Sequence, residues 1–253
     1  MKTILTMCFV LSIMAATLAQ ETPFPEWFEN VTVVIEKWDA EGKIKPHGAG
    51  FLYFDSSTNS PYLVTNHHLT FGKDSLQMRY NAIDGSAKNY TLTFEQDSTK
   101  SNWRIHPEKR IDLLLYRIPK ELPFKTINSS SIKLSTELKL GDEVYFIGFP
   151  ISESTIDRKV YPLLRHGIIA YVIKERLLMF SPPADYPPGT ILIDGTVQPG
   201  NSGGPVISFS RVGTQGVSLI GVIQGHLGTS SGQNSVLGVV IPTERILEVI
   251  AAF

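Results

Sequence analysis

The sequence predicts an all-β protein made of two successive halves and a short final helix. Short runs rich in β-branched and aromatic residues recur along the chain, and Gly, Pro, Asn, Asp or Ser bounds each run. A stretch near residues 119–135, with two prolines and a serine cluster, divides these runs into two series. Because the chain has 253 residues and 42% hydrophobic content, it is long enough for one large or two modest β domains without disulfides or metals.

The expected strands follow one another along the chain. In the first half they fall at 31–35, 49–54, 62–65, 76–80, 90–94 and 113–118. In the second half they fall at 143–147, 167–173, 177–180, 190–193, 205–209, 218–223 and 237–241. A helix is expected at 243–252, with Thr243 as N-cap and Ile246, Leu247 and Ile250 on one face. We therefore place an N-terminal β domain at 20–122, a linker at 123–135 and a C-terminal β domain with the helix at 136–253.

Residues 1–19 have the pattern of a signal peptide. A basic second residue, an apolar core and small residues at positions 17 and 19 favour cleavage after Ala19 and a secreted or periplasmic protein. The single cysteine, Cys8, falls in this segment, so the mature chain is expected to contain none. A lipid anchor at Cys8 is disfavoured because Met7 is too large for the preceding position. A retained anchor is the main alternative, although the apolar run is shorter than the roughly 20 residues that span a bilayer.

The charge balance indicates no nucleic-acid partner and no membrane patch. The chain carries 23 basic and 24 acidic residues, a net charge of −1. We expect no metal, no organic cofactor and no transmembrane span in the mature chain, and the sequence leaves the oligomeric state open. Sequons at Asn30, Asn89 and Asn128 would carry glycans only in a eukaryotic secretory pathway. The absence of mature cysteines makes a bacterial source the more favoured one.

The sequence Gly-Asn-Ser-Gly-Gly-Pro at 200–205 is the strongest indication of chemistry. A serine hydroxyl is a poor nucleophile unless a base takes its proton and donors meet the developing oxyanion. Glycines permit the required turn, so the N–H of Gly200 can point inward beside that of Ser202. The segment also fits the nucleophile elbow of α/β-hydrolases, but that fold needs an acid and then a histidine after the serine. No aspartate follows Ser202, and His226 is the single histidine there.

Two upstream segments offer the missing partners. The apolar run 62–65 leads into a histidine pair, and we take His68 as the candidate base. Taken alone it could be a structural histidine, while a zinc pair with His67 is disfavoured because adjacent strand residues face opposite ways. Asp112 heads a strongly apolar strand. A buried carboxylate requires a partner, such as a histidine N–H, although Asp112 taken alone could equally cap the strand start.

The order His68, Asp112, Ser202 resembles that of the trypsin-like (chymotrypsin-fold) serine peptidases, and most closely their HtrA-type branch. Further resemblance is carried by 48–51, 64–68, 111–115, 141–150, 167–169, 194–205, 219–222 and 240–246. It implies two six-stranded antiparallel β-barrels with the active site between them. It also implies that Ser202 is the nucleophile, that His68 is the base oriented by Asp112, and that the N–H groups of Gly200 and Ser202 form the oxyanion hole. Many HtrA-type members continue into a PDZ domain, and we expect none here.

One departure from the digestive trypsins concerns activation. Where those enzymes have an aspartate that pairs with a new amino terminus, this chain has Asn201, and it lacks an Ile-Val-Gly-Gly start. We therefore expect activity without zymogen cleavage.

Alignment to the family places Thr196, Val197 and Gln198 on one side of the primary specificity pocket and Gln224, Gly225 and His226 on the other. None of these residues is acidic, so an uncharged, small to medium, apolar side chain is expected before the scissile bond. His226 could narrow the pocket, or could protonate and favour an acidic side chain.

These features predict a serine endopeptidase acting through an acyl-enzyme. The alternative is a protease-fold binding module that has lost activity, but such proteins usually lose a triad member or the glycine turn. A one-residue slip that gives the base role to His67 is also open, and the spacing after Val64-Thr65 favours His68.

Overall fold

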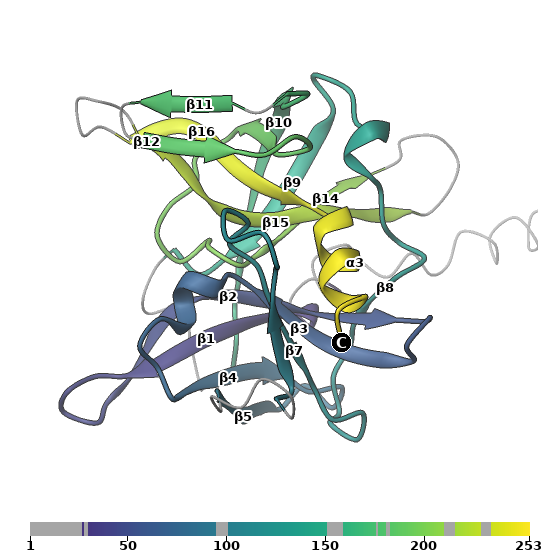
Figure 1. The fold of residues 1–253 in the computed structure, drawn as a ribbon. Coiled ribbons are helices and arrows are strands. Elements are labelled where there is room, and N and C mark those ends of the chain that lie inside the picture. The colour runs from purple at the N-terminus through teal and green to yellow at the C-terminus, as the bar shows by residue number, and fades with distance from the viewer. Residues whose placement is uncertain are drawn as a thin grey trace, which may run out of the picture.

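The computed structural model describes residues 27, 30–94, 101–150, 159–175, 177–180, 183–209, 216–228 and 234–253. These residues form two β-rich halves, one above the other in Figure 1, joined along one side by the C-terminal helix α3 (Glu244–Ile250). The expected signal peptide, with Cys8, lies outside the described residues. Within the described part of the chain, no helix is long and apolar enough to span a membrane.

The first half is one twisted sheet of eight strands. The strands are β1 (Thr32–Trp38), β2 (Ile44–Asp55), β3 (Ser60–Thr65), β4 (Ser75–Asn81), β5 (Ala87–Thr93), β6 (Trp103–Ile105), β7 (Leu114–Arg117) and β8 (Ile127–Asn128). They pair in the order β5-β4-β1-β2-β3-β7-β6, and β8 adds to β2 in parallel. The short 3₁₀ helix η1 (His67–Thr70) follows β3 after one residue, Asn66.

The second half is a closed six-stranded barrel in the order β10-β13-β16-β15-β14-β9. Its strands are β9 (Glu143–Gly148), β10 (Leu163–Val172), β13 (Ile191–Asp194), β14 (Pro205–Phe209), β15 (Val217–Gly228) and β16 (Asn234–Pro242). A separate hairpin of β11 (Leu177–Phe180) and β12 (Pro183–Tyr186) lies beside the barrel, and the 3₁₀ helix η2 (Ser135–Glu137) precedes β9.

The predicted all-β class with a C-terminal helix is confirmed, and each expected run overlaps an observed strand. The first half differs in detail from a six-stranded barrel, because its described strands form a curled sheet that ends at β5 and β6 instead of closing. Residues expected as a linker contribute β8 to this sheet, and Ile132 bridges to Leu219 in the barrel. Thr243 precedes α3 as expected, but its hydroxyl donates to the Leu219 carbonyl at 3.2 Å instead of capping the helix.

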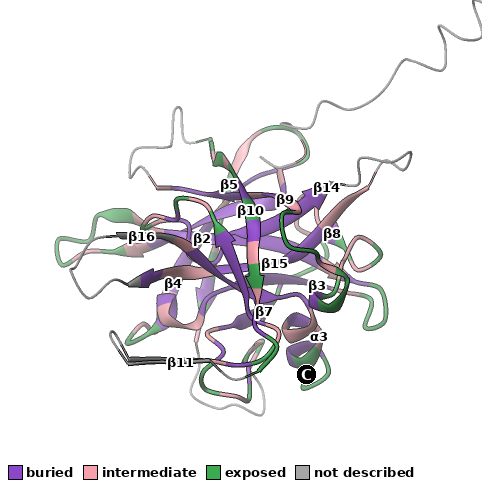
Figure 2. Cartoon of the chain, turned by 90° about the horizontal axis from the view of Figure 1, so that it is seen from above, coloured by how far each residue is buried: buried purple, intermediate pink, exposed green. Residues whose placement is uncertain are grey.

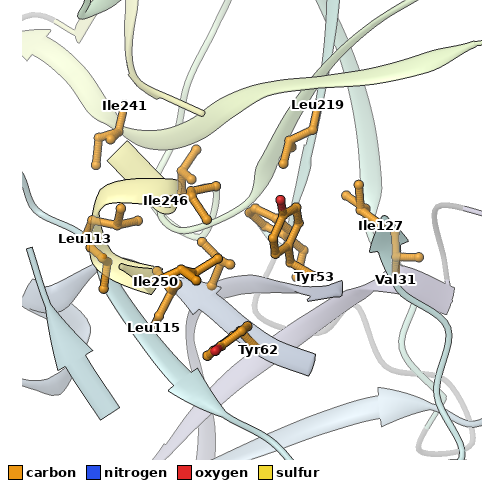
Figure 3. Close-up of a cluster of buried hydrophobic side chains, with 14 of the residues drawn as sticks. Val31, Tyr53, Tyr62, Leu113, Leu115, Ile127, Leu219, Ile241, Ile246 and Ile250 are labelled. Carbon is orange, nitrogen blue, oxygen red and sulfur yellow. The ribbon is translucent and has the colours of Figure 1, made fainter. Parts of the chain in front are cut away.

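The largest hydrophobic cluster lies between the two halves (Figure 3). Buried side chains of β2, β3 and β7 meet those of β15 and β16, and Ile246 and Ile250 of α3 fill the space between them. Each half also has its own core, and exposed residues fall mostly in the connections (Figure 2). Because the cluster joins the halves, their relative placement is determined by the same apolar burial that stabilises the fold.

Candidate active site

Strand pairing brings Asp112 next to His68. β3 and β7 are antiparallel, and Thr65 at the end of β3 pairs with Leu114 at the start of β7. The residues just after β3 and just before β7 therefore lie at the same edge of the sheet. The Asp112 Oδ2 lies 2.5 Å from the His68 Nδ1, and its Oδ1 accepts the His68 backbone N–H at 2.8 Å. One carboxylate thus holds both the ring and the backbone of His68.

Backbone contacts fix the peptide of Asp112 as well as its side chain. The Asn66 Nδ2 donates to the Asp112 carbonyl at 2.9 Å, and the His67 N–H reaches the same oxygen at 3.4 Å. Asn66 is fully buried between the strand and the histidine pair. This role of Asn66 was not among the predictions from the sequence, although a polar residue between a buried strand and a histidine pair could have suggested it.

The two histidines have different surroundings. The ring of His67 packs edge-on against Phe71, with centroids 4.7 Å apart. Burial lowers the pKa of His67, against the opposing effect of the Asp112 carboxylate. The side chain of His68 is 38% exposed while that of Asp112 is 18% exposed, so the imidazole is paired on one side and accessible on the other. Of the two histidines, His68 is the one that contacts the Asp112 carboxylate.

The glycine turn leaves two N–H groups available. The N–H groups of Asn201, Gly203 and Gly204 donate to the carbonyls of Gln198, Ile223 and Asn201, at 3.0, 2.8 and 2.9 Å. Within the described part of the chain, the N–H groups of Gly200 and Ser202 have no backbone acceptor. The turn therefore presents the pair of donors that an oxyanion would need.

Asn201 closes the turn from inside. Its backbone N–H donates to the Gln198 carbonyl, and its Oδ1 accepts the Gln198 N–H at 2.9 Å. In the turn from Gln198 to Asn201, Pro199 and Gly200 are the two central residues. A type II turn favours proline at the first central position and requires positive φ at the second, and Gly200 has φ 94°. A Cβ on Gly200 would lie 2.1 Å from the Phe149 carbonyl oxygen. This backbone therefore requires glycine at position 200 for two independent reasons.

The turn docks against the first half beside the end of β3. The Ala49 N–H donates to the Ser202 carbonyl at 2.8 Å, and the Thr65 Oγ1 donates to the Ala49 carbonyl at 2.7 Å. A Cβ on Gly203 would meet both that carbonyl and the Thr65 hydroxyl, at 2.1 and 2.5 Å. Ser202 thus lies next to the strand that leads to His68. Its Oγ donates to the Gln224 carbonyl at 3.5 Å, and among the described residues it makes no hydrogen bond to His68.

The residues expected around a specificity pocket do not all present their side chains to one. Val197 is buried in the barrel core, where it packs near Gly238, so its contribution to a pocket would come from its backbone. Gln224, Gly225 and His226 follow one another on β15 and are partly exposed. Thr196 is exposed, and Gln198 is half-buried.

Arg165 of β10 contacts two of these residues, Thr196 and Gln198, and was not among the residues predicted from the sequence. Its Nη2 donates to the Gln198 Oε1 at 2.6 Å, and its Nη1 lies 3.4 Å from the Thr196 carbonyl. Arg165 lies before the run expected as a strand, and no local pattern connects it to residues 31 and 33 positions later. Among the described side chains, no cluster of three or more His, Cys, Asp or Glu could hold a metal ion.

Comparison with known proteins agrees with this architecture. The solved MamO protease domain from Magnetospirillum magneticum, in its apo form, has a similar fold with a TM-score of 0.58. The two sequences are 15% identical, and the match covers 87% of this chain and 96% of that one. No curated protein matches the chain. A family model described as a trypsin-like peptidase domain matches residues 48–213, well over half of the chain. The chain therefore belongs to the trypsin-like peptidase family.

Proposed function

We propose that the protein is a serine endopeptidase that hydrolyses peptide bonds through Ser202, His68 and Asp112. The observation that carries the proposal is the double contact of the Asp112 carboxylate with the ring and backbone of His68. Such a contact fixes both the orientation of the imidazole and the nitrogen that carries its proton. The N–H groups of Gly200 and Ser202, which have no backbone acceptor among the described residues, would supply the second requirement of acyl transfer.

The proposed reaction follows from these positions. The Ser202 Oγ attacks the scissile carbonyl while the His68 Nε2 accepts its proton, and the N–H groups of Gly200 and Ser202 bind the oxyanion. The tetrahedral intermediate collapses, the C–N bond breaks, and His68 returns the proton to the leaving amine. Water then attacks the acyl-enzyme with His68 again as base, which releases the carboxylic acid and regenerates the serine hydroxyl. Asp112 stabilises the imidazolium that forms in each step.

We further propose that activation requires no cleavage of a pro-segment. In this structure the fully buried Asn201 holds the turn through its own Oδ1 and backbone N–H. No new amino-terminal cation is needed to pair with a neutral amide. Mature protein that retains an N-terminal tag should therefore be as active as protein from which the tag has been removed. Activity that appears only after tag removal would contradict this.

The substrate class that fits best is polypeptide with an uncharged side chain before the scissile bond. The expected pocket residues include no carboxylate, and the Arg165 guanidinium is engaged with Gln198. The location is a separate matter. The signal-peptide pattern of residues 1–19 supports a peptidase acting in the periplasm or outside the cell.

One observation favours the second candidate, a catalytically silent binding module. The Ser202 hydroxyl is directed to the Gln224 carbonyl rather than to His68. The direction of this hydroxyl depends on a single side-chain torsion, and catalytic hydrogen bonds are often long before substrate binds. The serine orientation therefore weighs less than the intact pairing of His68 and the intact turn.

A fluorophosphonate probe tests the proposal directly, because it reacts with a serine only when a base and an oxyanion hole are both present. Residues 20–253 would be compared with Ser202→Ala, His68→Ala and His67→Ala, and a mixed peptide library would be added. We expect labelling and cleavage by the wild type and by His67→Ala only. Loss of activity in His67→Ala with retention in His68→Ala would reverse the base assignment. A folded wild-type chain that neither labels nor cleaves would favour the binding module.

A further inference from the structure

Asn81, at the end of β4, clamps a distant segment of backbone. Its Nδ2 donates to the Val160 carbonyl at 2.8 Å, and its Oδ1 accepts the Val160 N–H at 3.0 Å. The side-chain amide thus makes the two bonds that a paired strand residue would make. Both residues are buried, and 79 positions separate them in the sequence. Because these polar groups are shielded from water, breaking the clamp would leave a donor and an acceptor of Val160 unsatisfied.

Val160 packs into a small cluster that joins the two halves. The cluster consists of Val34, Ala49, Phe149 and Val160. Val34 and Ala49 are paired neighbours on β1 and β2, while Phe149 directly follows β9 of the barrel. All four side chains are at most 3% exposed. The clamp therefore fixes one corner of a close-packed group, in which a shift of one member is transmitted to the others.

Two members of this cluster also hold the glycine turn by their backbones. The Phe149 N–H donates to the Gly200 carbonyl at 2.9 Å, and the Ala49 N–H donates to the Ser202 carbonyl at 2.8 Å. These bonds fix the two carbonyls, and so the two peptide groups that flank the Ser202 N–H. The backbone of Phe149 is in addition so close to Gly200 that no Cβ would fit between them.

We infer that Asn81 is a positioning residue for the oxyanion hole, acting through Val160 and the cluster on the peptide groups around Ser202. The inference rests on the proposed function, and the effect is indirect because both bonds of the clamp join the Asn81 amide to the backbone of Val160. Without the clamp, Val160 and then Phe149 and Ala49 gain freedom, and the donors at Gly200 and Ser202 lose alignment. Such alignment matters mainly in the transition state, because a ground-state carbonyl is bound more weakly there than the oxyanion.

The test compares Asn81→Ala with Asn89→Ala, which removes an exposed asparagine from the adjacent strand β5. Active sites are counted by fluorophosphonate titration, so that a smaller folded fraction does not lower the measured kcat. We expect Asn81→Ala to lower kcat per titrated site about tenfold or more while KM stays within about twofold, since a misplacement of about 1 Å can cost about a hundredfold. Asn89→Ala should match the wild type.

Amide hydrogen exchange supplies a readout that does not depend on activity. The N–H groups of Ala49 and Phe149 are the direct reporters, because they donate to the turn. Both should exchange faster in Asn81→Ala, while Val222 on β15 should be unchanged. If Asn81→Ala does not fold, Val160→Ala replaces it. That variant keeps both clamp bonds, which use the backbone of Val160, but removes two methyl groups from the cluster. We expect a several-fold lower kcat with unchanged KM.

A native kcat per titrated site in folded Asn81→Ala would overturn the inference, whatever the melting temperature of the variant. In the Val160→Ala arm, an unchanged kcat would do the same. If the wild-type chain itself proves inert, the proposed function fails, and exchange alone decides the inference. Faster exchange at Ala49 and Phe149 would then uphold the coupling between Asn81 and the turn, and unchanged exchange would overturn it.

Discussion

Asp112→Asn isolates the role of the carboxylate without removing the contact that it makes. An asparagine at this position can still accept the His68 backbone N–H through Oδ1, a bond of 2.8 Å in the wild type. Its second polar atom, however, is an NH₂ group facing the ring Nδ1, where the carboxylate Oδ2 now lies at 2.5 Å. The ring must then accept at Nδ1 and carry its proton on Nε2. In that tautomer His68 has no lone pair for the proton of Ser202.

The expected loss is large in rate and small in stability. A wrong tautomer in such a triad lowers kcat by about 10⁴, which corresponds to about 5 kcal/mol of barrier. Because the hydrogen bond to the His68 backbone survives, the free energy of unfolding should fall by no more than about 1 kcal/mol. The assay is kcat on a peptide substrate near neutral pH together with urea unfolding. Asp84→Asn serves as control, since Asp84 accepts hydrogen bonds from Ser86 in an exposed turn. A folded Asp112→Asn protein that keeps more than about a hundredth of wild-type kcat would refute the proposed role.

Two further substitutions follow from the structure. Gly200→Ala should abolish fluorophosphonate labelling and lower the melting temperature, because its Cβ would lie 2.1 Å from the Phe149 carbonyl oxygen. Gly42→Ala is the control, since Gly42 also has positive φ but a Cβ there would meet no atom within 4 Å, and this variant should label normally. Glu248→Gln should lower the free energy of unfolding by about 0.5–1 kcal/mol at pH 7. Burial raises the pKa of Glu248, but hydrogen bonds from His106 and Arg245 outweigh this effect and lower the pKa below its ordinary value of 4.5. The stability that the ionised Glu248 contributes is therefore complete at pH values above 4.5, and it disappears as the pH falls through the lowered pKa. Urea unfolding of the wild type and Glu248→Gln at pH 7 and at a pH well below 4.5 checks this. A difference in their free energies of unfolding that persisted at the lower pH would contradict it.

Much of the fold was predictable because its strands are locally encoded. Runs of β-branched and aromatic residues bounded by turn residues found the long strands of both halves, which are those that build the cores. The missed strands are short, or carry a residue unfavourable to a strand: β8 has two residues, β6 has three, and β12 starts at Pro183. Closure of a sheet depends on which edges meet, and no run of residues contains that information. The curled first sheet was therefore beyond a local prediction.

The candidate site was predictable where one segment carries its own geometry. The glycine turn requires positive φ at Gly200 and close approach of the backbone at Gly203, so the glycines in the sequence indicate the local backbone conformation directly. His68 and Asp112 became recognisable through their order, and the register of β3 and β7 explains why they meet. Arg165 and Asn81 could not be found this way, because their partners lie 33 and 79 positions away and an isolated arginine or asparagine has no distinctive pattern.

The interface between the halves supports the site as well as the fold. Ile111 and Leu113, on either side of Asp112, both point into the shared cluster, and Val64 of the strand before His68 lies in it too. From the barrel, Val222 enters the same cluster next to Ile223, whose carbonyl accepts the Gly203 N–H at 2.8 Å. Large-to-small changes in such a core cost about 2–5 kcal/mol, a large part of the usual 5–15 kcal/mol of stability. A substitution there would therefore move the two parts of the proposed active site relative to each other before it unfolded the chain, so kcat should respond at temperatures where the protein is still folded.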